Sequence, residues 1–146
     1  FQYGGPHLCD DWNFGTPDGK AHFFAIKPEE TEIPEGKFAL TTRRGKQFNS
    51  MVHAATDRIT GAKREAILIN TSDATRLGVK NGDALHLKNE FGEYTGHVFL
   101  APVKPGNLQV HWPEGNVLLD RARVSPDAGV PDYNTYVTAT TNPTDE

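Results

Sequence analysis

The chain has 146 residues, of which 36% are hydrophobic and 23% charged, a composition typical of a single globular domain. Its net charge of -4 argues against a general nucleic-acid binder, because such proteins neutralise many phosphates with Lys and Arg. The single cysteine, Cys9, excludes an internal disulfide and a C-x-x-C pair, and no apolar run approaches the roughly 20 residues of a membrane span. We therefore expect a cytoplasmic protein whose partners include neither nucleic acid nor a membrane.

Residues 1–34 show little periodicity and many turn formers, and we interpret them as an N-terminal arm or a linker from a preceding domain. Within them, Ala21–Ile26 has the pattern of one strand, which Lys27-Pro28 would end. Because position 1 is Phe, we expect the chain to be a piece of a longer polypeptide. Its aromatic residues are too apolar for a free tail, so we expect them to pack on the main domain, on a neighbouring domain, or as a small satellite core: Trp12, Phe14, Phe23 and Phe24.

The main domain, which we assign to residues 35–141, opens with the apolar run Phe38–Leu40, a predicted strand. The next ten residues, Thr41–Ser50, combine three cations, a glycine and several hydroxyl and amide side chains. Arginine forks suit phosphate, and Gly45 lets a backbone come close to a ligand. The segment matches neither a P-loop nor G-x-G-x-x-G. Two interpretations remain open, an anion site and a solvated basic loop between strands.

The middle of the chain predicts one strand, one short helix and one hairpin. A polar excursion leads to the strand Ala66–Ile69. Capping side chains and a following Gly78 then predict a short helix over Asn70–Leu77. Alternation at Leu85 and Leu87, a turn over residues 89–92 and the return strand Tyr94–Leu100 form the hairpin.

The last third predicts a strand at Leu108–Trp112, a turn-rich stretch as far as Pro131, and a strand at Tyr136–Ala139. We expect residues 142–146 to be a frayed tail. Many short strands with few helical segments predict a mainly β fold. The expected architecture is a small barrel with one or two short helices and an irregular N-terminal arm.

Taken together, these segments resemble the C-terminal dinucleotide-binding domain of the molybdopterin oxidoreductases, the family of formate dehydrogenases, periplasmic nitrate reductases and dimethyl sulfoxide reductase. The segments that carry the resemblance are Phe38–Arg43, Asn70–Ala74, Leu77–Asp83, Lys104–Gly106, Asn116–Leu118 and Pro131–Tyr133. They occur in the family's order. Two stretches, Thr41–Ser50 and Gln109–Asn116, look most like the formate-dehydrogenase-like branch.

The resemblance implies a double-psi β-barrel that binds molybdopterin guanine dinucleotide, with molybdenum or tungsten as the metal. It also implies that the partners are the preceding catalytic domains of the same polypeptide, which share the cofactor. The residues that it places on the cofactor are Thr42, Arg43, Arg44, Gly45, Lys46, Gln47, Asn49, His111, Trp112, Asn116, Tyr133 and Asn134. For Trp112, a place in the barrel core remains an equally open interpretation. The family often has a lysine after the aromatic residue at 133, so Asn134 is a departure that weakens any charge role there.

In this family the metal ligand and any iron-sulfur cysteines lie in earlier domains. We therefore expect no catalytic residue and no metal ligand in this chain, and no turnover by this chain alone. A second hypothesis is a stand-alone β-barrel that acts as a small subunit or a protein-binding adaptor. A self-processing decarboxylase is excluded because no Gly-Ser pair occurs, and the six histidines lack the spacing of a zinc hydrolase.

Overall fold

The computed structural model describes residues 9–28, 32–45 and 54–141, and it divides the chain into two compact units, residues 1–31 and 32–146. The predicted ligands Lys46, Gln47 and Asn49 lie outside the described residues, as does the predicted frayed tail. Within the described ranges, no helix combines the length and the apolar character needed to cross a membrane.

The described part of the first unit has one short 3-10 turn, η1 (Asp10–Trp12), and no strand. The predicted strand at Ala21–Ile26 is therefore wrong. A strand is stabilised by a neighbour that takes up its main-chain hydrogen bonds, and the described residues of this unit supply none. Phe23 is 95% exposed and Phe24 is 82% exposed, so they form no satellite core.

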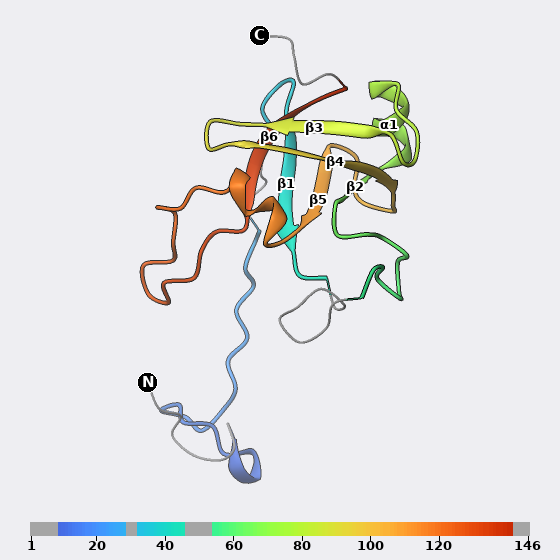
Figure 1. Cartoon of the computed structure of the whole chain (residues 1–146). Helices are drawn as coiled ribbons and strands as arrows, with labels where there is room; N and C mark the ends of the chain where they lie inside the picture. The colour runs from blue at the N-terminus through green and yellow to red at the C-terminus, as the bar shows by residue number, and fades with distance from the viewer. Residues whose placement is uncertain (1–8, 29–31, 46–53, 142–146) are drawn as a thin grey trace. The chain divides into compact units, whose positions relative to one another are not determined.

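The second unit is a closed barrel of six strands in the order β1-β5-β2-β4-β3-β6, shown in Figure 1. Its strands are β1 (Phe38–Arg43), β2 (Ala66–Ile69), β3 (Ala84–Lys88), β4 (Glu93–Leu100), β5 (Asn107–His111) and β6 (Asn134–Thr140). Two neighbouring pairs are parallel, β1 with β5 and β2 with β4, and the other pairs are antiparallel. The prediction of a mainly β barrel is confirmed.

The barrel interior is filled by aliphatic side chains that alternate along the strands. On β1, for example, Phe38 and Leu40 are buried and Ala39 between them is half-buried. Every residue of β2 is buried, because Ile67 and Ile69 belong to the main core while Leu68 joins a second apolar cluster. Full burial of a side chain of this size contributes about 1.5–3 kcal/mol. The interior is therefore a packed core.

The first strand is longer than the sequence indicated, since β1 continues through Arg43 where we expected a loop after Leu40. Thr42 is buried and continues the inward alternation of the strand. Thr41 is paired on both sides, with Gln109 of β5 and Asn134 of β6. Strand pairing on both edges, together with the β preference of threonine, extends the strand into the basic segment.

The helix α1 (Thr71–Leu77) confirms the predicted capped helix between barrel strands. The side chain of Asn70 accepts a hydrogen bond from the main-chain N–H of Ser72 at 2.9 Å. Gly78 ends the helix with φ of 71°, a left-handed conformation that glycine adopts without steric cost. Local sequence therefore determines both ends of α1.

A second short helical segment, the 3-10 helix η2 (Glu114–Leu118), follows β5. Its far end is held by the β3–β4 turn, because Asn89 donates its side-chain Nδ2–H to the carbonyl oxygen of Leu118 at 2.8 Å. The same side chain accepts hydrogen bonds from the main-chain N–H groups of Phe91 and Gly92. Asn89 thus closes the hairpin turn and attaches η2 to it.

Candidate functional site

The ends of β1 and β5 bring two distant parts of the chain together. The two strands run parallel with Arg43 opposite His111, so they end at the same level of the barrel. Beyond them, the main-chain N–H of Trp112 donates to the carbonyl oxygen of Arg43 at 3.0 Å. The Arg44 guanidinium lies over the Trp112 ring, 5.5 Å from its centroid, in a cation-π contact. Two predicted arginines and a predicted indole therefore form one surface.

The segment that carries Asn116 packs tightly against the same strand ends. A Cβ atom on Gly115 would lie 2.3 Å from Val110 Cγ2 and 3.3 Å from Thr42 Cγ2, so only glycine permits this approach. Asn116 is the next residue, and it is exposed. The structure thus places Asn116 at the end of the barrel where β1 ends.

Two further predicted residues adjoin β1 from the side of β6. The main-chain N–H of Thr42 donates to the carbonyl oxygen of Tyr133 at 2.9 Å. The Asn134 side chain accepts from the Thr41 hydroxyl at 2.8 Å and donates to an Asp132 carboxylate oxygen at 2.9 Å. It also lines a polar hollow of about 480 Å³. The amide of Asn134 therefore joins β6 to β1 in this structure.

His111 has a different environment from the one that stacking on a ligand requires. The ring is 1% exposed, and its Nδ1 atom lies 3.3 Å from the main-chain oxygen of Arg64. Burial lowers the pKa of His111, and the nearby charge of Arg43 lowers it further, so the neutral imidazole is favoured. The adjacent Trp112 is only half-buried. The aromatic surface at this end of the barrel therefore comes from Trp112, because His111 is buried.

Sequence reasoning missed three residues that border the site. The Nε and Nη2 atoms of Arg64 lie 2.8 and 2.7 Å from the same Glu114 oxygen, Oε1. The pKa of Tyr94 is raised to about 12, mainly because the phenol is buried and to a smaller extent because Glu114 and Glu65 carry negative charge. Arg64 and Glu114 are 50 residues apart, and no local pattern pairs them. Only the barrel brings them together.

Three buried oxygen atoms at or near this site have no hydrogen-bond partner among the described residues. They are Thr42 Oγ1, Tyr94 Oη and Glu114 Oε2. A buried polar atom without a partner costs about 1–3 kcal/mol, and native proteins contain few of them. Their presence at one end of the barrel distinguishes that end as a candidate site for a polar ligand.

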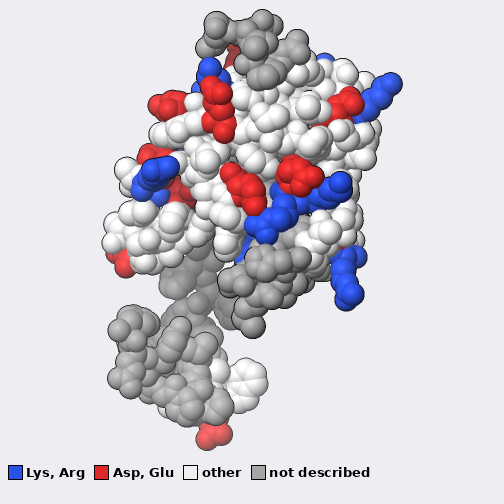
Figure 2. Space-filling model, in the orientation of Figure 1, with Lys and Arg blue, Asp and Glu red and all other residues white. Residues whose placement is uncertain are grey.

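The chemistry of the exposed groups suits an anionic heterocyclic ligand. Arginine forks bind phosphate oxygens, an indole stacks on flat rings, and a side-chain amide both donates and accepts at a heterocycle edge. Arg43 uses one of its N–H groups on Gln109, at 3.3 Å, which leaves other donors on the same fork. On the face shown in Figure 2, positive and negative residues are interspersed, and the whole chain has a net charge of -4.

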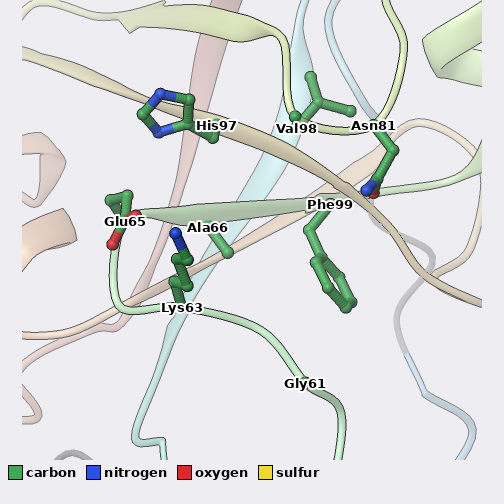
Figure 3. A pocket seen from close by; sticks show the side chains of 9 residues that line it. Gly61, Lys63, Glu65, Ala66, Asn81, His97, Val98 and Phe99 are labelled. Carbon is green, nitrogen blue, oxygen red and sulfur yellow. The ribbon is translucent and has the colours of Figure 1, made fainter. Parts of the chain in front are cut away.

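The described residues contain no group of three or more His, Cys, Asp or Glu side chains that could hold a metal ion. A separate groove of about 320 Å³ lies where β2 begins, beside β4. Figure 3 shows Lys63, Glu65, His97 and Phe99 around it, and none of the predicted site residues lines it. The sequence-based prediction concerns the end of β1 and β5, and its residues do not line this groove.

Comparison with known protein families assigns the chain to one of them. The family model of the molydopterin dinucleotide binding domain matches residues 38–137, which is most of the chain. The match covers the whole barrel except the end of β6. The chain belongs to this family. The predicted membership of a molybdopterin-dependent family is confirmed. The match says nothing of the formate-dehydrogenase-like branch.

Among curated relatives, this domain is similar to uncharacterized oxidoreductases of Mycobacterium bovis and Mycobacterium tuberculosis. Each is 27% identical over 137 residues, which covers 84% of this chain and 17% of the relative. The chain therefore spans less than a fifth of the length of these relatives.

Among solved structures, acetylene hydratase from Pelobacter acetylenicus matches with a TM-score of 0.50 and 14% identity, over 72% of this chain and 18% of that protein. A rationally designed double-psi β-barrel protein matches with a TM-score of 0.47 and 18% identity, over 71% of this chain and 93% of that protein. The domain is a double-psi β-barrel, as the resemblance implied. These likenesses concern the fold alone.

Proposed function

We propose that this domain is the C-terminal cofactor-binding part of a cytoplasmic oxidoreductase that resembles formate dehydrogenase, and that it binds molybdopterin guanine dinucleotide. Family membership supports the binding of a molybdopterin dinucleotide, and the curated relatives are themselves described as oxidoreductases. The cofactor would be shared with preceding domains of the same polypeptide, which would supply the metal ligand.

The observation that carries the proposal is the convergence of Arg43, Arg44, Trp112 and Asn116 at one end of the barrel. Both strand ends must reach a single ligand, and the parallel pairing of β1 with β5 makes this possible. The buried Thr42 hydroxyl without a described partner lies in the same place. Arg43 and Arg44 would hold the diphosphate, Trp112 would cover a ring and Asn116 would meet a heterocycle edge.

When bound, the molybdopterin group supplies the metal at which electrons pass to or from the substrate. The residues of this domain bind and orient the dinucleotide. Charge-assisted hydrogen bonds to a diphosphate contribute about 1.5–3 kcal/mol each when well formed. An exposed Arg44 and a half-buried Arg43 contribute little to the core, so their loss should affect cofactor binding rather than folding.

The proposal is tested by replacing Arg43 and Arg44 with alanine in the intact parent enzyme. We expect the purified double variant to contain much less molybdenum or tungsten and less releasable nucleotide than the wild type, with unchanged thermal unfolding of this domain. A matched control removes two exposed lysines outside the site, Lys80 and Lys104, by the same substitution. Normal cofactor content in the double variant of the arginines would overturn the proposal.

Two finer parts of the proposal have separate tests. Mild hydrolysis of the wild-type enzyme should release GMP. Release of CMP would show that the dinucleotide carries cytosine instead of guanine, and the proposed site would stand. Assay of the same enzyme with formate and an artificial electron acceptor should show turnover. Activity on another substrate only would remove the formate-dehydrogenase likeness and leave the cofactor-binding function in place.

A further inference from the structure

We propose that Arg64 is a positioning residue for the dinucleotide site, because it fixes the segment from Trp112 to Asn116 through its ion pair with Glu114. This inference rests on the proposed function. Arg64 precedes β2 and belongs to neither of the two segments that meet at the site. Its contribution would be to hold one of those segments in place.

Arg64 contacts the site segment with both its side chain and its main chain. The guanidinium donates from Nε and Nη2 to Glu114 Oε1 at 2.8 and 2.7 Å, short distances for charge-assisted hydrogen bonds. The carbonyl oxygen of Arg64 lies 3.3 Å from the ring nitrogen of His111. Two points of attachment three residues apart therefore bracket Trp112.

The position of the 3-10 helix η2 follows from contacts at its two ends. Glu114 begins η2 and is held by Arg64, while Leu118 ends η2 and is held by Asn89. Between them Gly115 is pressed against Val110 and Thr42. Without Arg64, η2 would lose the attachment at its start, while the hydrogen bond from Asn89 and the packing of Gly115 and Leu118 would remain. Asn116 and Trp112 would then lose the fixed relation to Arg43 and Arg44 that a shared ligand needs.

The hydrogen bonds of this pair agree with a positioning role. The side chain of Arg64 is 32% exposed and that of Glu114 is 30% exposed. The two hydrogen bonds reach a single carboxylate oxygen, and Glu114 Oε2 is buried. Arg64 thus commits two donors to holding Glu114.

The test uses the whole 146-residue chain and guanosine 5′-diphosphate as the probe, measured by calorimetric titration. We expect Arg64→Met to weaken binding about tenfold, a typical loss when a residue that orients a binding group is removed. Glu114→Gln should weaken binding in the same direction. Arg64→Lys should lie between wild type and Arg64→Met, since lysine keeps the charge but lacks the fork.

The matched control is Arg76→Met, which breaks an arginine–carboxylate pair of similar length, 2.9 Å, between Arg76 and Asp73. This control should lower the melting temperature and leave the affinity for guanosine 5′-diphosphate unchanged. Equal affinities of wild type and Arg64→Met would overturn the inference while the proposed function stands. Absence of binding by the wild type would count against the proposed function.

A measurement without ligand keeps the inference testable in every case. In proton–nitrogen correlation spectra, Arg64→Met should shift the Trp112 indole and Asn116 amide resonances, and Arg76→Met should leave both in place. Unshifted Trp112 and Asn116 resonances in a folded Arg64→Met variant would show that Arg64 does not position the segment.

Discussion

The two ends of the barrel each carry an arginine–carboxylate pair, but they differ in how completely their polar groups are satisfied. Where β1 begins, both oxygens of Asp73 are used: Oδ1 accepts from Arg76 at 2.9 Å and Oδ2 accepts from the Gly106 N–H at 2.7 Å. Where β1 ends, Glu114 uses Oε1 for Arg64, and its buried Oε2 has no hydrogen-bond partner among the described residues.

This difference separates a structural end from the end at which we propose that the cofactor binds. The Asp73 carboxylate is nearly buried and ties α1 to the loop before β5, so its hydrogen bonds stabilise the fold. At the other end, Thr42 and Tyr94 also have buried oxygens without described partners. Such atoms reduce stability, and proteins retain them where polar ligands bind or where polar groups are arranged for a task. The contrast can be tested at each end by single substitutions.

The largest expected effect is at the structural end. Asp73→Ala should lower the free energy of unfolding by about 2–3 kcal/mol, because it removes charge-assisted hydrogen bonds to Gly106 and Arg76. Urea unfolding measures this loss. Asp83→Ala is the control, since that exposed carboxylate accepts from the main-chain N–H of Lys80 at 2.7 Å and should cost about 1 kcal/mol or less. Equal losses in the two variants would contradict the structural role given to Asp73.

The second effect is at the site end and concerns packing. Gly115→Ala should lower the free energy of unfolding by about 1–3 kcal/mol, because the new methyl group overlaps Val110 Cγ2. The double variant Gly115→Ala/Val110→Ala should lose less stability than the sum of the losses of the two single variants, since the clashing methyl group of Val110 is absent. Strict additivity, measured by the same urea titration, would show that Gly115 is not confined by Val110.

The smallest effect concerns Tyr94, and it appears mainly at high pH. Tyr94→Phe should raise the free energy of unfolding at neutral pH by about 1 kcal/mol, because it removes a buried hydroxyl that has no described partner. The pKa of Tyr94 is raised from 10.0 to about 12, so the unfolded phenol loses its proton first and wild-type stability falls as the pH rises between these values. The variant should lack this fall.

Tyr136→Phe is the matched control, because it removes another tyrosine hydroxyl of the barrel, one that donates to the Glu32 carbonyl oxygen at 3.3 Å. It should show the same alkaline fall as the wild type. If the Tyr94 variant also loses stability between pH 10 and 12 as steeply as the wild type, the desolvated environment assigned to Tyr94 is incorrect.

The sequence by itself determined the features that depend on neighbouring residues. Asn70 and Gly78 cap α1 by contacts within a few residues, and the turn at Asn89 closes its own hairpin. The alternation of apolar residues located most strands. These signals are readable because the stabilising contacts lie close together in the chain.

Only the tertiary structure decided which segments meet and which side chains remain available. The segment Ala21–Ile26 has no partner strand among the described residues of its unit, so alternation alone did not make a strand there. The resemblance placed His111 on the cofactor, but the structure buries its ring at the end of the parallel β1–β5 pair. The pairing of Arg64 with Glu114 spans 50 residues and depends on barrel closure. Contacts between distant segments form only when the whole fold brings their backbones together, so no local pattern records them.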